Sequence, residues 1–90
     1  MLSAFARAFS NQLIMAPIRD AAHEVAKEYV LEGMQQFFTR WGDHVYEEGM
    51  QIKDQKKLEN YANEKKDEIE AIRRQAKIQK MYKDVQIPLK

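Results

Sequence analysis

The chain has 90 residues, with 15 basic and 14 acidic side chains and a formal net charge of +1. A chain of this length forms one domain at most and buries a smaller share of its surface than a larger protein does. The balanced charge provides no overall electrostatic attraction to nucleic acid. The absence of cysteine excludes a disulfide framework and a cysteine-ligated metal site, and it is typical of a reducing compartment.

Turn-forming residues are scarce, because the sequence contains three glycines and two prolines. Since many-stranded folds need a turn signal about every 8–12 residues, we predict an all-α fold. The longest stretch without a charged residue runs from Ala8 to Ile18. A helix needs about 20 mostly apolar residues to cross a bilayer, so we predict that the chain has no transmembrane span of its own.

The N-terminal segment, residues 1–16, contains Arg7 and has no acidic residue; the first carboxylate of the chain is Asp20. Its apolar residues recur at helical spacing, which predicts a short amphipathic helix. An amphipathic, arginine-bearing segment without acids is typical of a mitochondrial transit sequence, although a helix docked on the body of a protein has the same spacing. We expect the segment to be retained, as an uncleaved address or as a docked helix. The apolar stripe consists of Leu2, Phe5, Ala6, Phe9 and Leu13.

A second helix is predicted over residues 17–42, because proline favours the first turn of a helix. Its apolar stripe comprises Ile18, Ala22, Val25, Tyr29, Val30, Met34, Phe37 and Trp41. Aromatic side chains can each bury about 150–250 Å², which is more than a short first helix could cover here. We therefore predict a docking helix. The predicted anchors of the interface are Phe5, Phe9, Tyr29, Phe37, Phe38 and Trp41.

A long charged helix is predicted over residues 43–84, with a kink at Gly49, because Gly42 and Asp43 form a stop-and-restart signal. Such a helix would measure roughly 60 Å, twice the diameter of about 30 Å expected for a compact chain of this size. Leu58, Ile69 and Ile72 are predicted interface residues. They belong to a weak coiled-coil seam of Leu58, Ala62, Lys65, Ile69, Ile72 and Ala76. We expect the helix to lie along a larger partner; the alternative is a solvated single helix.

The end of this helix is basic, since no acid lies between Ala71 and Lys83. Its cations predict contact with anionic lipid, RNA phosphates or an acidic protein groove, or they stabilise the helix dipole alone. Only Tyr82 offers an aromatic ring, so base stacking is poorly supported and a nucleic-acid partner is not expected. Residues 85–90 are predicted to form an extended tail, either docked or frayed. The cations are Arg73, Arg74, Lys77, Lys80 and Lys83.

Few residues suggest chemistry. His44 lies beside Asp43, Glu47 and Glu48, but these residues at one helix start lack the rigid set of ligands that a catalytic metal needs. The sequence contains no HExxH, glycine-rich phosphate loop or nucleophile elbow. We predict no catalytic, metal or cofactor site, and no enzymatic activity.

Together these patterns predict a non-catalytic helical accessory subunit of a larger assembly, and the transit-like N-terminus favours a mitochondrial one. The surface of the inner membrane, in a respiratory-chain or ATP synthase complex, is expected from a general likeness to the small helical subunits of such complexes, and no motif supports it. The expected partners are other protein subunits, with anionic lipid as a further contact. One alternative is a regulatory coiled-coil binder: the long charged helix is similar in character to that of mitochondrial ATPase inhibitors, although no flanking motif matches. The other alternative is a peripheral membrane or RNA-binding protein.

Overall fold

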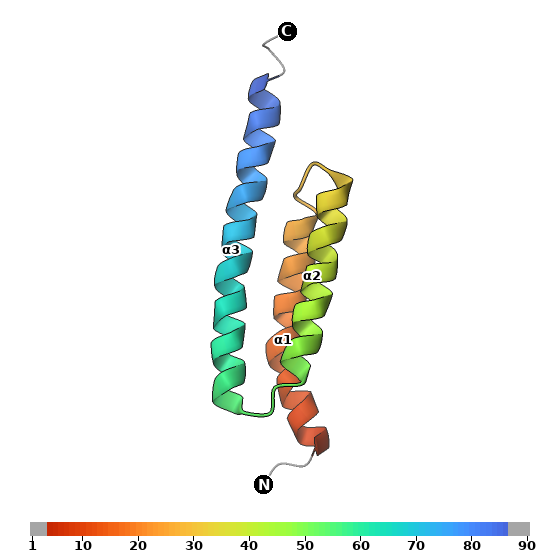
Figure 1. Cartoon of the computed structure of the whole chain (residues 1–90), viewed down its shortest axis with the longest axis vertical. Helices are drawn as coiled ribbons and strands as arrows, with labels where there is room; N and C mark the ends of the chain where they lie inside the picture. Colours follow the sequence, from red (N-terminus) through yellow and green to blue (C-terminus); the bar gives the residue numbers. More distant parts are fainter. Residues whose placement is uncertain (1–3, 87–90) are drawn as a thin grey trace.

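The structure is a computed structural model that describes the backbone of residues 4–86 and the side chains of residue 6 and residues 8–82. It consists of three helices, α1 (Ala4–Ala26), α2 (Glu32–Met50) and α3 (Gln55–Gln86). Figure 1 shows α1 and α2 as an antiparallel hairpin, with α3 returning alongside α1 in the same direction as α1. The prediction of an all-α fold is confirmed, since residues 4–86 contain no strand.

The core is a seam in which buried residues alternate at steps of four and three, the repeat that left-handed helix packing requires. Because α1 contributes the longest series and lies against both other helices, it is the central helix of the fold. α2 and α3 contact each other at few points. The buried residues are Asn11, Met15, Ile18, Ala22, Val25, Ala26 and Tyr29 from α1 and its C-terminal turn, Gly42, Val45 and Gly49 from α2, and Leu58, Ala62, Ile69 and Ala76 from α3.

The prediction that a new helix starts at Pro17 is wrong, because α1 continues through this residue. A proline inside a helix removes one backbone hydrogen bond and costs about 3 kcal/mol. Met15 and Ile18, which flank it, are 0% and 2% exposed. Burying such a side chain contributes about 1.5–3 kcal/mol, so the packing on both sides of Pro17 offsets the cost of continuing the helix.

The α1–α2 connection falls at residues 27–31, so the prediction of one helix over residues 17–42 is wrong. This connection contains neither glycine nor proline, which are the usual signals for a turn. The turn closes through backbone bonds of the tight i→i+3 type, such as the 3.0 Å bond from the Glu28 amide to the Val25 carbonyl. Tyr29 is fixed at both ends: its carbonyl accepts from Gln35 Nε2 at 2.7 Å, and its hydroxyl donates to the Ile72 carbonyl of α3 at 2.9 Å. Side-chain anchoring therefore defines this turn.

Gly42 and Asp43 lie inside α2, so the prediction that a helix stops and restarts there is also wrong. Gly42 is required for close packing between helices. A Cβ atom at this position would lie 2.8 Å from the Cβ of Ala22 on α1. Asp43 caps no helix and instead pairs with His23 of α1, with 2.8 Å between Oδ1 and Nε2.

The break between α2 and α3 occurs at residues 51–54, within the predicted helix over residues 43–84. Asn11, which is 5% exposed, donates from Nδ2 to the carbonyls of Gly49 at 3.0 Å and Ile52 at 2.8 Å, and so satisfies the C-terminal end of α2. Asp54 then caps α3, since its Oδ1 accepts from the Lys57 amide at 3.1 Å. The prediction of one continuous helix over residues 43–84 is therefore wrong, because the chain turns after α2 and α3 runs back alongside α1 (Figure 1).

The predicted seam of α3 is confirmed as its inward face, but it packs on α1 of the same chain rather than on a partner. The 32 residues of α3 span about 48 Å, and its C-terminal end extends past the α1–α2 turn (Figure 1). The radius of gyration is 16.4 Å, whereas a compact chain of this size would have about 12 Å. The molecule is elongated, although less so than the predicted rod implied.

The prediction of an extended tail over residues 85–90 is wrong for its first two residues. Residues 85 and 86 belong to α3 and are helical, not extended. The remainder of the predicted tail, residues 87–90, lies outside the described residues.

Candidate protein interaction site

The outer side of α2 carries an aromatic hollow, which is the candidate site. Phe37 is 62% exposed, and Trp41, one helical turn later, is half-buried. Gly33 leaves the space open, since a Cβ atom there would meet nothing within 4 Å. The hollow measures about 480 Å³ and is lined by Gly33, Gln36, Phe37, Arg40, Trp41 and His44.

The predicted aromatic anchors divide into two groups. Tyr29 is buried, and its ring stacks on that of Phe38 with centroids 4.9 Å apart. Phe38 in turn meets the exposed ring of Phe37 edge-on at 5.1 Å. The stacked pair of buried Tyr29 and half-buried Phe38 packs on the core and holds Phe37 against it, so the exposed ring is presented by a rigid base.

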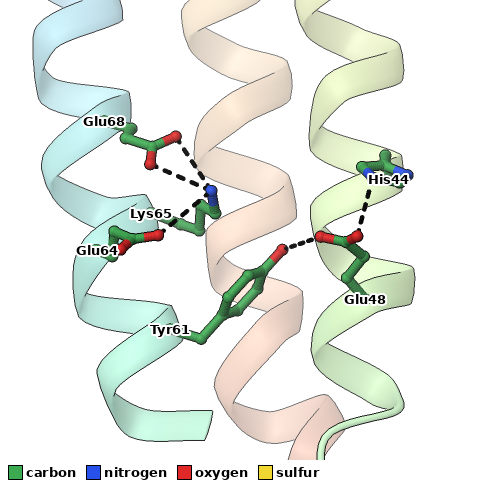
Figure 2. Close-up of polar contacts among 6 residues, drawn as sticks. All are labelled: His44, Glu48, Tyr61, Glu64, Lys65 and Glu68. Carbon is green, nitrogen blue, oxygen red and sulfur yellow. Dashed lines mark hydrogen bonds and ion pairs between the residues drawn. The ribbon is translucent and has the colours of Figure 1, made fainter. Parts of the chain in front are cut away.

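A polar cluster lies beside the hollow, where α2 faces α3 (Figure 2). The Tyr61 hydroxyl of α3 donates to Glu48 Oε1 of α2 at 2.9 Å, and His44 Nε2 lies 3.2 Å from the other oxygen of Glu48. Burial, together with the hydrogen bond to Glu48, raises the pKa of Tyr61 above its usual range. Lys65 lies between Glu64 and Glu68, at 3.6 and 3.1 Å. Each group of this cluster has a partner, and the hydrogen bond from Tyr61 to Glu48 joins α3 to α2, whereas the ion pairs lie within a single helix.

Two described residues of the N-terminal apolar stripe, Phe9 and Leu13, face away from the core. Phe9 and Leu13 are 58% and 64% exposed, because the buried side of α1 is formed by Asn11 and Met15. α1 therefore docks by a different face from the one that the stripe suggested. The side chain of the predicted anchor Phe5 lies outside the described residues.

The predicted interface residues of α3 pack into the core that the three helices of this chain form. Leu58 and Ile69 are buried, and Ile72 is half-buried against the same core. Their apolar surface is covered by α1, and the structure places none of them beside the aromatic hollow of α2 in a joint surface.

The predicted cations occupy the second half of α3. Arg74, Lys77 and Lys80 are exposed, whereas Arg73 is paired with Glu70 at 2.6 Å. The side chain of Lys83 lies outside the described residues. Three exposed apolar side chains that were not among the predicted interface residues, Ile78, Met81 and Tyr82, lie among these cations. Their i, i+3, i+4 spacing was the signal for an outward face.

The side chains described bring together no three histidine, aspartate or glutamate residues that could hold a metal ion. Within residues 4–86, none of the helices has a stretch long and apolar enough to cross a membrane. What the geometry provides is apolar and charged surface for binding.

Comparisons with known proteins give no match: no family model fits the chain, and no curated protein or solved structure matches it.

Proposed function

We propose that this protein is a non-catalytic helical accessory subunit of a larger mitochondrial assembly, located at the surface of the inner membrane in a respiratory-chain or ATP synthase complex. The observation that carries the proposal is the aromatic hollow of α2. An exposed phenylalanine on a rigid base, beside a half-buried tryptophan, is the kind of anchor that dominates binding at protein interfaces.

The hollow suits one apolar side chain of a partner subunit. Phe37 and Trp41 supply its apolar walls, and Arg40 supplies a cation at its edge. A partner segment with an apolar anchor and a neighbouring carboxylate would satisfy both features. The exposed pair Phe9 and Leu13 on α1 offers a second apolar contact.

The mitochondrial location is supported by the sequence. No acid precedes Asp20, and Arg7 lies among the apolar residues of an amphipathic segment. Phe9 and Leu13 of this segment are exposed, which leaves these two apolar side chains available for recognition.

The coiled-coil regulator has less support. A regulator that inserts a long helix into a partner needs a free apolar seam, and the seam of α3 is covered by α1. For that function α3 would have to leave α1, with exposure of Leu58 and Ile69 to water.

The test combines location and surface protection. Immunoblotting of fractionated cells should find the chain in mitochondria. Hydroxyl-radical footprinting should oxidise Phe37 readily in the purified chain and much more slowly in intact mitochondria, while Val30, exposed at the α1–α2 turn, serves as the comparison site. A chain found in another compartment would refute the mitochondrial part. Equal oxidation of Phe37 in both samples would refute the interface.

A further inference from the structure

The C-terminal half of α3 has an outer face that no other part of the described chain covers. The inward face ends with Ala76, which is 1% exposed, and with a 3.6 Å contact from Gln79 to Met34 of α2. Beyond it the helix extends past the α1–α2 turn (Figure 1). On the opposite side, Met81 and Tyr82 are 64% and 62% exposed.

This face combines apolar and cationic groups in one pattern. Ile78, Met81 and Tyr82 follow i, i+3, i+4 spacing and so share a side of the helix. Arg74 is four residues before Ile78, and Lys77 is four residues before Met81, so each cation neighbours an apolar side chain. Among the described residues, no carboxylate pairs with Arg74 or Lys77.

We propose that this outer face, formed by Arg74, Lys77, Ile78, Met81 and Tyr82, binds the surface of an anionic phospholipid bilayer. A bilayer surface supplies both features that the face requires: negative headgroups for the cations, and an acyl boundary for the apolar side chains. Long basic side chains can reach the headgroups while their stems lie along apolar surface. The inference rests on the proposed function and names the membrane surface that the subunit contacts.

Lipid explains the face better than nucleic acid does. RNA would neutralise the cations but would leave Ile78 and Met81 without an apolar partner, and Tyr82 is the one ring on this face that could stack on a base. The net charge of the whole chain is only +1, so adsorption would depend on this local cluster and not on a general field.

The experiment uses the purified full chain and sedimentation with phosphatidylcholine vesicles, prepared with or without cardiolipin. The test variant is Arg74→Gln with Lys77→Gln. The matched control is Lys56→Gln with Lys57→Gln, two exposed cations at the other end of α3. Each pair removes two positive charges, which changes the net charge from +1 to −1 in both variants. Circular dichroism checks that both variants retain the helical fold.

We expect binding to cardiolipin vesicles only. Since a cation near an anionic surface contributes about fivefold in affinity, the Arg74/Lys77 variant should bind about 25-fold more weakly. The Lys56/Lys57 control should lose less than about threefold by the same reasoning, because those cations would lie away from the membrane. The Ile78→Ser, Met81→Ser variant should also bind more weakly, with its residual binding more sensitive to salt.

Equal loss in the two charge variants, or equal binding to both kinds of vesicle, would overturn the proposal. Tighter binding to RNA or to an acidic polypeptide than to cardiolipin vesicles would also overturn it. The assay contains no partner subunit. A failure here would therefore leave the proposed subunit role standing, and a failure of the mitochondrial fractionation would not by itself affect vesicle binding.

Discussion

Replacement of Gly42 by alanine tests the packing of α1 against α2. In an isolated helix this change stabilises by about 1 kcal/mol, because alanine favours the helix more than glycine does. In this fold the new Cβ would lie 2.8 Å from the Cβ of Ala22 and 3.3 Å from Cδ2 of His23. The Ala22 methyl group cannot rotate away, so the two helices must separate.

Overpacking of this kind costs about 1–3 kcal/mol. A contact fixed to the backbone of both helices should lie at the upper end of that range, which leaves a net loss of about 1–2 kcal/mol after the gain in helix propensity. Gly33→Ala is the matched control, because its Cβ would meet nothing within 4 Å. It should stabilise by about 0.5 kcal/mol, since it lies in the first turn of α2.

Urea denaturation followed by far-UV circular dichroism measures both variants. Ala22→Gly provides the second arm, because it removes the methyl group that the new side chain would meet. In that background, Gly42→Ala should cost at least about 1 kcal/mol less than it does in the natural sequence. If Gly42→Ala stabilises as much as Gly33→Ala does, the close approach at Gly42 does not exist and the α1–α2 packing described above is wrong.

Three further predictions concern hydrogen bonds. Asn11→Leu should lower the free energy of unfolding by about 1–3 kcal/mol, because buried carbonyls at the end of α2 lose their donor. A variant with the same free energy of unfolding as the natural chain would contradict this role. Asp54→Ala should cost about 1 kcal/mol through loss of the α3 cap, and Asp54→Asn should recover most of it. The pKa of Tyr61 is raised by burial and by its bond to Glu48, so folding favours the protonated hydroxyl. Its contribution is complete below the unfolded pKa of about 10 and declines as the pH rises above that value. The free energy of unfolding should therefore fall less steeply with alkaline pH in Tyr61→Phe than in the natural chain. Tyr29, whose pKa burial also raises, contributes to the slope that remains. An unchanged slope would exclude Tyr61 as a source.

The sequence was sufficient to predict the helical class and much of the core. The spacing of Ile18, Ala22, Val25 and Tyr29 identified the buried side of α1 and its turn, because a heptad-like pattern is a local property. The same reasoning identified the inward face of α3. It could not identify what covers that face, since periodicity is the same for a seam that packs within a chain and for one that packs between chains.

The helix ends were not predictable from local signals here. Pro17 and Gly42 are usual helix breakers, yet both lie inside helices. Burial of the residues around Pro17 offsets the cost of a proline within α1, and Gly42 lies where α1 approaches α2 closely. The real break before α3 depends on Asn11, forty residues away in sequence from the connection that it stabilises. Such a bond follows from the antiparallel register of α1 and α2, which the sequence does not specify by itself.

The candidate site was predicted in part. Phe37 and Trp41 were selected as anchors because they are large and aromatic, and both border the hollow of α2. Tyr29 and Phe38 were selected for the same reason, yet they support the site from the core side. Composition alone cannot separate the exposed ring of Phe37 from the half-buried ring of Phe38, because the two residues are adjacent in the sequence and differ only in the direction of their side chains.

The proposed role as a mitochondrial subunit is tested most directly by the mass of the particle with which the chain migrates. Mild-detergent extracts of mitochondrial membranes should be separated by native electrophoresis and probed for the chain, with the purified 10.6 kDa protein run beside them. We predict that the chain migrates with a particle many times larger than itself and that Phe37→Ser reduces its share there, while Val30→Ser does not. Migration of the natural chain entirely with the purified protein would contradict the account.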